Sequence, residues 1–263
     1  MDLQLRGKVA LVAASSRGLG RAIAEALAAE GADLVLAARD ATRIADVARE
    51  LASRHGVRAI GIQADVSRSA DVEALVAAAL REFARVDVLV TNAGGPPSGT
   101  FESLPADAWP KAVALTLESV VGLCRGVLPG MKERRWGRIL NVTSIAVKQP
   151  VDNLILSNSL RAAVTGFART LANEVAPFGI TVNNLMPGYT RTERVEELAN
   201  ASAKAKGTTP AEELARWEGQ IPMGRLGEPH EFAALAAFLA SERASYITAQ
   251  SIAVDGGWIR SLL

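Results

Sequence analysis

Small residues near the start of the chain have the types and spacing that could hold a phosphate group. Gly18 and Gly20 lack a Cβ atom, so the backbone there can approach a ligand closely. They separate an apolar run, residues 9–13, from an amphipathic segment after Leu19, a pattern that predicts a strand, a tight turn and a helix. Free N–H groups at a helix start favour an anion, and a dinucleotide pyrophosphate fits this turn best. The alternative is a turn of a parallel sheet that binds nothing.

The segments that follow complete a unit of the length that a mononucleotide-binding half requires. Gly31 and Ala32 end the predicted helix, and a second apolar strand is predicted over residues 33–37. The glycine turn is therefore expected at the carboxyl end of the first of two parallel strands.

The end of the second strand indicates which dinucleotide is preferred. Enzymes that use NAD place a carboxylate there to hold both ribose hydroxyls, whereas the 2′-phosphate of NADP needs cations. Ala38 stands at that position, Arg39 follows it and Arg17 lies in the glycine turn, which favours NADP(H). Asp40 would take the NAD role if it turned inward; we expect it instead to cap a helix that begins near Thr42.

The composition narrows the class of protein. With 263 residues, 49% of them hydrophobic, the chain can bury the core of one large α/β domain, predicted to span residues 1–263. The 29 Lys and Arg residues against 28 Asp and Glu leave a net charge of +1, which gives no electrostatic case for a nucleic acid or a membrane as partner. The single cysteine, Cys124, excludes an internal disulfide, no run of 18 apolar residues occurs, and a signal peptide's apolar region is missing. A soluble, cytoplasmic protein is expected.

Strand and helix patterns alternate along the whole chain, without a linker or an obvious repeat. Such alternation predicts a doubly wound parallel sheet with helices on both faces, whose ligands lie beyond the carboxyl ends of the strands. The predicted strands lie near residues 9–13, 33–37, 59–63, 86–90, 138–142, 181–185 and 251–254.

Two segments stand out within this alternation. Residues 189–220 are rich in Glu, Arg, Lys, Thr and Ala, with Gly207 and Pro210 as breakers. They predict a mobile helical flap over the strand ends, with a solvated surface excursion as the alternative. One helical pattern carries an apolar stripe, expected to pack on the sheet with any surplus face free for a subunit contact: Leu160, Val164, Phe167, Leu171 and Val175.

Short motifs, in order over nearly the whole chain, carry a family resemblance. They are Ala13-Ala-Ser-Ser-Arg-Gly-Leu-Gly20, Ala64-Asp65-Val66, Thr91-Asn-Ala-Gly94, Gly137-Arg-Ile-Leu-Asn-Val-Thr-Ser144, Gly179-Ile-Thr-Val-Asn-Asn184, Pro187-Gly188, and Ser245-Tyr-Ile-Thr248 leading to Asp255-Gly256-Gly257. The chain resembles a short-chain dehydrogenase/reductase, especially the bacterial 3-oxoacyl-[acyl-carrier-protein] reductases, which implies a Rossmann-type fold. Where the family has Thr-Gly, this chain has Ala13-Ala14, which the turn accepts at little cost if φ is negative there.

The resemblance also implies which residues contact the cofactor NADP(H). It assigns the pyrophosphate and adenosine ribose to Ser15, Arg17, Gly18, Leu19 and Gly20, the 2′-phosphate end to Ala38 and Arg39, the adenine to Asp65 and Val66, the cleft wall to Asn92, Ala93 and Gly94, and the nicotinamide to Pro187 and Gly188.

The family's catalytic positions hold different residues here. In family members a tyrosine thirteen residues after the strand-end serine donates the proton, and a lysine four residues later lowers its pKa and holds the nicotinamide ribose. Counted from Ser144, these positions hold Ser157 and Arg161, and the supporting asparagine, seven residues after Trp109, is Thr116. An aliphatic hydroxyl has a far higher pKa than a phenol, and arginine keeps its proton, although it can still bind a ribose hydroxyl. We therefore predict an intact cofactor cleft with a non-standard catalytic site.

Two other residues could supply the missing chemistry. Lys148, four residues past Ser144, could act as an acid or bind an anionic substrate if it is desolvated; the alternative is a solvated loop lysine. Tyr189 is expected to line the cleft rather than to donate a proton. No His, Cys, Asp or Glu spacing indicates a zinc or calcium site, and the two histidines do not form a Ser/His/Asp set.

Three functions fit these observations. The first is an NADP(H)-dependent oxidoreductase acting on a small carbonyl or hydroxyl compound. The second is a dinucleotide-binding protein without turnover, a sensor or an inactive partner of an active homologue. The third is a non-redox enzyme that uses the nucleotide structurally. Hydride transfer needs mainly positioning, which favours the first. The resemblance and the apolar stripe suggest a homotetramer or homodimer.

Overall fold

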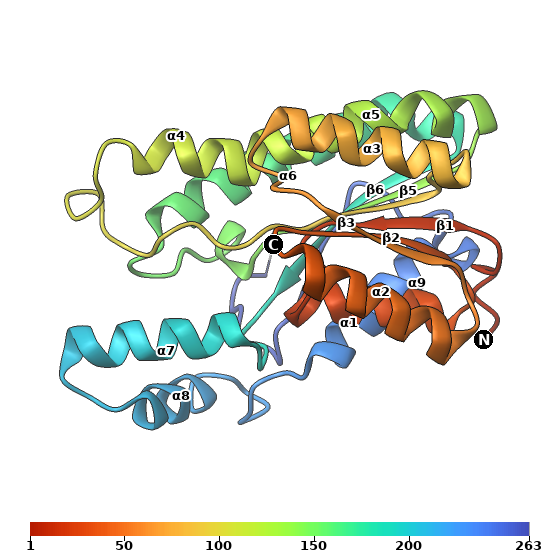
Figure 1. The fold of residues 1–263 in the computed structure, drawn as a ribbon. Helices are drawn as coiled ribbons and strands as arrows, with labels where there is room; N and C mark the ends of the chain where they lie inside the picture. The colour runs from red at the N-terminus through yellow and green to blue at the C-terminus, as the bar shows by residue number, and fades with distance from the viewer. Residues whose placement is uncertain (263) are drawn as a thin grey trace.

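The chain folds around one twisted parallel sheet with helices on both faces (Figure 1). The computed structural model describes residues 1–262. The seven strands follow the order β3-β2-β1-β4-β5-β6-β7, and every neighbouring pair is parallel. The strand order reverses between β1 and β4, which is where doubly wound sheets bind their ligands. The predicted α/β fold class is confirmed.

Each predicted strand is present. The observed bounds are β1 Val9–Val12, β2 Asp33–Ala38, β3 Ala59–Gln63, β4 Val88–Thr91, β5 Gly137–Val142, β6 Ile180–Pro187 and β7 Ser251–Val254. The strands β1, β4 and β5 are buried along their whole length, as expected for the centre of a sheet covered on both faces. β6 runs two residues further than predicted and so carries Pro187 to the carboxyl edge of the sheet.

Two groups of helices cover the two faces. Figure 1 shows α3, α5 and α6 on one face and α1, α2 and α9 on the other. The bounds are α1 Gly18–Ala29, α2 Ala41–His55, α3 Ser69–Phe83, α4 Ala108–Val113, a π-helical turn Ala114–Glu118, α5 Ser119–Arg134, α6 Ile155–Val175, α7 Glu193–Lys206, α8 Pro210–Glu218 and α9 Pro229–Ala240.

The continuous helical segment Ala108–Arg134 is long and apolar enough, by length and composition alone, to cross a membrane. In the fold it is a core helix, because Val120, Leu123, Val127 and Met131 are buried in the cluster formed with α3, α6 and the sheet. Cys124 is buried in the same cluster, and burial raises the pKa of its thiol to about 12. This thiol is therefore inert at neutral pH.

The apolar stripe of α6 is used inside the protein. Leu160, Val164, Leu171 and Val175 are buried, and Phe167 packs on the same core. The predicted packing of this stripe on the sheet is therefore confirmed, and a subunit contact through any surplus face stays a prediction.

The predicted flap segment is helical. Figure 1 shows α7 and α8 lying together beyond the carboxyl ends of the strands, apart from the helices on the two faces of the sheet. Val195 and Trp217 are buried against Ile145, Met186 and a residue from the carboxyl-terminal segment, Trp258. The segment therefore has its own apolar contacts with the sheet edge, unlike a solvated excursion.

A buried carboxylate ties the two flap helices together. Glu213 of α8 is 2% exposed and accepts hydrogen bonds from Ser202 and Lys206 of α7, from Thr208 and from Arg216. The Ser202 hydroxyl and these other donors outweigh desolvation and lower the pKa of Glu213 to about 2. The carboxylate is thus ionised, and it couples α7 to α8 at any ordinary pH.

Candidate active site

A cleft of about 570 Å³ opens at the carboxyl ends of β1, β2, β4, β5 and β6 and is closed on one side by α7. Most of the site residues predicted from the sequence line it: Arg17, Gly18, Leu19, Ala38, Arg39, Asp65, Val66, Asn92, Ala93, Gly94, Ser144, Ser157, Arg161, Pro187 and Gly188. Ser15, Gly20, Thr116 and Lys148 do not form part of its wall.

The glycine turn presents the start of α1 to this cleft. No side chain caps α1 in the described part of the chain, and Gly18 adopts φ +56°. Gly20 is needed for packing, because a Cβ atom there would lie 2.3 Å from the Ala14 carbonyl oxygen and 2.8 Å from Nδ2 of Asn92. The uncapped N–H groups and the helix dipole make this end of the cleft attractive to an anion.

Ser15 does not lie where the family resemblance suggested. It is fully buried; its Oγ donates to the Val12 carbonyl at 2.9 Å and accepts from the Ala37 amide at 3.2 Å. These bonds join the ends of β1 and β2 beneath the cleft. Ser15 therefore shapes the turn from below, and the expected contact with a pyrophosphate is not supported.

Ala14 adopts φ +48°, so the condition under which alanine would cost little is not met. An L-residue with a Cβ atom in the left-handed region costs roughly 1–2 kcal/mol relative to a right-handed one. The carbonyl oxygen of Ala14 accepts from Nδ2 of Asn92 at 3.3 Å, which helps to hold this conformation. Glycine would adopt this left-handed conformation without the strain that alanine has there.

The end of β2 is positively charged. The Asp40 side chain accepts from the Arg43 amide at 2.9 Å and caps α2, which confirms its predicted capping role. Arg39 forms no ion pair within residues 1–262, but its charge is felt by Asp65. Partial burial tends to raise the pKa of Asp65. Hydrogen bonds from Ser67 and the charges of Arg39 and Arg68 outweigh this effect and lower the pKa.

Three predicted residues meet at the other end of the cleft. Ser144 follows β5 and caps a short 3₁₀ turn, its Oγ accepting from the Ala146 amide at 3.1 Å. Ser157 and Arg161 lie four residues apart on α6, so one face of this helix directs both toward the cleft. Nη1 of Arg161 donates to the Val142 carbonyl at 2.7 Å, which fixes the guanidinium beside the end of β5.

The structure does not bring Thr116 or Lys148 to this group. Thr116 is 5% exposed and lies in the π-helical turn, and its Oγ1 has no hydrogen-bond partner within the described residues. Lys148 is exposed on the loop after β5, outside the cleft wall. The exposed position of Lys148 agrees with the alternative of a solvated loop lysine. It does not support the hypothesis that Lys148 contacts a ligand.

The flap supplies cleft residues that sequence reasoning missed. Arg194, at the start of α7, lines the cleft, and its Nη2 donates to the Pro96 carbonyl at 3.1 Å. Tyr189 also lines the cleft, as expected, and stacks on Trp217 with ring centroids 4.8 Å apart. In the sequence, only the charge-rich segment after Pro187 could have pointed to Arg194 as a cleft residue.

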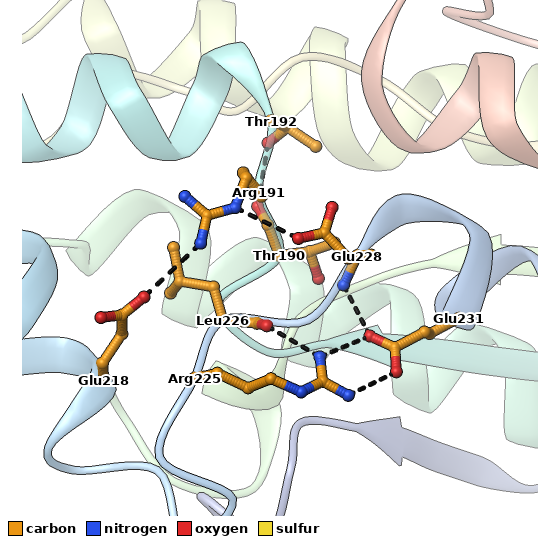
Figure 2. Close-up of polar contacts among 8 residues, drawn as sticks. All are labelled: Thr190, Arg191, Thr192, Glu218, Arg225, Leu226, Glu228 and Glu231. Atoms are coloured by element: carbon orange, nitrogen blue, oxygen red, sulfur yellow. Dashed lines mark hydrogen bonds and ion pairs between the residues drawn. The ribbon is translucent and has the colours of Figure 1, made fainter.

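Ion pairs hold the base of the flap (Figure 2). Arg191 donates from Nε to Glu228 at 3.2 Å and pairs through Nη2 with Glu218 at 3.6 Å, so it links the two ends of the flap to the start of α9. Arg225 forms a two-point contact with Glu231, at 2.8 and 2.6 Å. These contacts position the segment that carries Tyr189 and Arg194.

Comparisons with known proteins agree with this geometry. Residues 13–259 match the family model described as Enoyl-(Acyl carrier protein) reductase. The chain is 38% identical over 256 residues to a ketoacyl reductase assigned to the monensin polyketide synthase of Streptomyces virginiae, covering 97% of this chain and 98% of the relative. It is 36% identical to the 3-oxoacyl-[acyl-carrier-protein] reductase of Vibrio cholerae, covering 97% and 98%.

A solved structure gives the same result for the fold. L-sorbose reductase from Gluconobacter frateurii, crystallised with NADPH and L-sorbose, superimposes with a TM-score of 0.94 at 36% identity, and all of both chains is covered. The chain belongs to the short-chain dehydrogenase/reductase family.

Proposed function

We propose that this protein is an NADP(H)-dependent oxidoreductase that transfers a hydride between the nicotinamide and a carbonyl or hydroxyl group of a small molecule. The observation that carries the proposal is the single cleft that joins two kinds of surface. One end has the uncapped start of α1 and Arg39; the other has Ser144, Ser157 and Arg161. The relatives named above act on carbonyl compounds, and L-sorbose reductase binds NADPH.

The residues of the cleft fit this cofactor. Gly18 and Leu19 offer free N–H groups for the pyrophosphate, and a Cβ atom on Gly94 would meet nothing within 4 Å, so the wall there is open. Ala38 leaves the end of β2 without a carboxylate for the NAD ribose, and Asp40 is engaged as a helix cap. Arg39 is then the natural partner of a 2′-phosphate. NADPH, when bound, supplies the hydride.

The chain's own residues would act on the charge that develops at the substrate oxygen. The Ser144 hydroxyl accepts from a backbone amide, which leaves its proton free to donate to that oxygen. Ser157 presents a second hydroxyl, and the cation of Arg161 stabilises negative charge in a site partly shielded from water. Because neither serine nor arginine gives up a proton near neutral pH, we propose that water supplies the proton to the alkoxide, with hydroxide released to solvent.

A dinucleotide-binding protein without turnover is the second candidate. Tyr189 is the phenol in the cleft wall, and its ring is packed between Trp217 and Trp258. Burial, despite the opposing charge of Arg216, raises the pKa of Tyr189 and makes it a poor replacement for an activated catalytic tyrosine. A cleft that can hold the cofactor but has no titrating proton donor fits a protein that senses the dinucleotide without turnover.

Purified protein with NADPH and a panel of ketones, quinones and acyl thioesters tests the two candidates. The oxidoreductase predicts loss of NADPH absorbance with at least one carbonyl compound, and at least about tenfold slower turnover for Ser144→Ala. Equally tight NADPH binding without consumption of any substrate, in wild type and Ser144→Ala alike, would support the sensor instead.

We further propose that the protein is soluble and cytoplasmic and forms a homodimer or homotetramer. The outer side of α6 has the small exposed residues Ala162, Ala163 and Gly166, which permit close approach of a second helix. Sedimentation velocity at micromolar concentration tests the assembly, and a stable monomer would contradict it.

A further inference from the structure

Two guanidinium groups line the cleft from different parts of the fold. Arg161 projects from α6 and Arg194 from the start of α7, and both line the cavity with Ser144 and Ser157. A guanidinium has five N–H donors. The guanidinium of Arg161 uses Nη1 for the Val142 carbonyl and has no other hydrogen bond or ion pair to any of residues 1–262. Most of its donor capacity is therefore available to a ligand.

No carboxylate among residues 1–262 forms an ion pair with Arg161. Other cations along the cleft have carboxylate partners: Arg17 lies 3.8 Å from Glu197, and Arg43 lies 3.5 Å from Glu193. Arg194 donates to the Pro96 carbonyl and shares the exposed Glu197 with Arg17, at 3.5 Å, a pair that is weak because solvent screens it.

Burial and the neighbouring charge of Arg194 lower the pKa of Arg161 to about 10. This value still leaves the group protonated at neutral pH, so the half-buried cation persists. A half-buried cation without a counter-charge is unfavourable, and a bound anion would relieve that cost.

The cofactor does not provide this anion under the proposed function. Its pyrophosphate is assigned to the start of α1 and its 2′-phosphate to Arg39, so neither is assigned to Arg161. The ribose between the pyrophosphate and the nicotinamide carries hydroxyl groups without charge. The wall of the same cleft also carries the apolar side chains of Ile145, Val151 and Leu198. The surroundings suit a molecule with a small apolar body and one negative group.

We infer that the substrate is an oxo acid, or the corresponding hydroxy acid, whose carboxylate binds between Arg161 and Arg194. This inference rests on the proposed function. A guanidinium matches a carboxylate with two parallel hydrogen bonds. Arg161 is held rigidly by Val142, while Arg194 arrives with the flap, whose base is fixed by the ion pairs of Arg191 (Figure 2). The acid would thereby also bring the carbonyl group next to Ser144.

Matched acids and esters test the inference in turnover. We would measure kcat/KM with NADPH for 4-methyl-2-oxopentanoate and 3-oxohexanoate and for their methyl and ethyl esters. Wild type is expected to prefer the acids at least about tenfold, because only the acids make charge-assisted bonds. Arg194→Gln and Arg161→Gln should each remove most of this preference. Arg58→Gln, which removes an exposed ion pair with Glu82 outside the cleft wall, is the control and should keep the preference.

Binding without turnover separates this inference from the proposed function. Each acid or ester is added to protein saturated with NADP⁺, with which an oxo compound does not react, and the fluorescence of Trp217 and Trp258 beside Tyr189 is followed. Tighter acid binding that needs Arg194, even without turnover in the first experiment, supports the acid site while the oxidoreductase proposal fails. Turnover without any acid preference overturns the acid site and leaves the oxidoreductase standing. Equal losses for acid and ester in both arginine variants, with weaker NADPH binding, also overturn it, since Arg161 would then serve the ribose.

Discussion

The two ends of the cleft are built in different ways. At the α1 end the surface is mostly backbone: Gly18 and Leu19 present N–H groups, and Gly20 is required because a side chain would strike the Ala14 carbonyl. At the Ser144 end the surface is made of side chains from three separate segments, which include Arg161 and Arg194. A backbone surface keeps its function as long as the path of the chain is kept, whereas a side-chain surface changes its chemistry with single substitutions. The same fold can therefore hold one cofactor and carry different reactions.

The largest expected effect comes from restoring the family's residues at the Ser144 end. The variant Thr116→Asn, Ser157→Tyr, Arg161→Lys should create or raise NADPH-dependent reduction of an activated ketone by roughly 10² to 10⁴ in kcat/KM, because a positioned phenol supplies general acid catalysis. The single variants should do little, since tyrosine without lysine keeps an ordinary pKa.

Kinetics of wild type, singles and the combined variant on the same ketones check this. Normal NADPH binding with no gain in the combined variant would mean that the pocket differs in shape as well as in its acid. A wild type faster than the combined variant on its own substrate would show that Ser157 and Arg161 belong to a different working site.

The α1 end of the cleft should determine which of NADPH and NADH binds more tightly. NADPH is expected to bind at least about tenfold tighter than NADH, a difference of about 1.4 kcal/mol. Arg39→Asp should reverse the order, because a carboxylate repels the 2′-phosphate and accepts from ribose hydroxyls. Fluorescence titration measures both affinities. Arg58→Gln, whose partner Glu82 lies away from the cleft, is the control with unchanged preference. Equal affinities in wild type would contradict the assignment of Arg39.

The coupling of α7 to α8 through Glu213 is expected to weaken at low pH. The pKa of Glu213 is about 2 in the folded protein and near 4.3 in an unfolded chain, so its stabilising contribution is complete above the unfolded value. That contribution is lost as pH falls from about 4.3 toward 2, because the unfolded state then takes up the proton first. Glu213→Gln should lower Tm by a few degrees at pH 7, and the difference from wild type should shrink in this acid range. A difference that stays constant from pH 7 to pH 3 would show that the carboxylate charge is not what couples α7 to α8.

The sequence was most informative where regular backbone carries the function. The seven strands, the start of α1 and the cap at Asp40 were all predicted, since apolar periodicity, glycines and capping residues act locally. The cleft position of Asn92 and Pro187 follows from the same fact, because Asn92 comes directly after β4 and Pro187 is the last residue of β6, and the ends of both strands define the cleft.

Side-chain direction was beyond sequence reasoning. Ser15 turns inward to the backbone of β1 and β2, and Lys148 remains in solvent, although both stand in motifs near the cleft. Arg194 reaches the cleft because the apolar contacts of Val195 and Trp217 dock the flap, a long-range packing result that no local pattern reports. The apolar stripe of α6 was predicted to be a helix face that packs on the sheet, and it lies in one core cluster with strand residues.

The smallest expected effect concerns the one strained position of the glycine turn. Ala14→Gly should raise the free energy of unfolding by about 0.5–1 kcal/mol, because the removal of left-handed strain, roughly 1–2 kcal/mol, exceeds the extra chain entropy that glycine adds to the unfolded state. Urea unfolding measures this change. Ala84→Gly is the matched control: Ala84 ends α3 with φ +60°, far from the cleft along the chain, and it should gain a similar amount without any effect on NADPH affinity. Ala14→Gly should in addition change NADPH affinity by less than about threefold, since Ala14 already has a left-handed conformation that glycine adopts readily. A loss of stability in Ala14→Gly beside a gain in Ala84→Gly would mean that the Ala14 methyl group makes favourable contacts that outweigh its strain, and that the α1 end of the cleft depends on side chains after all.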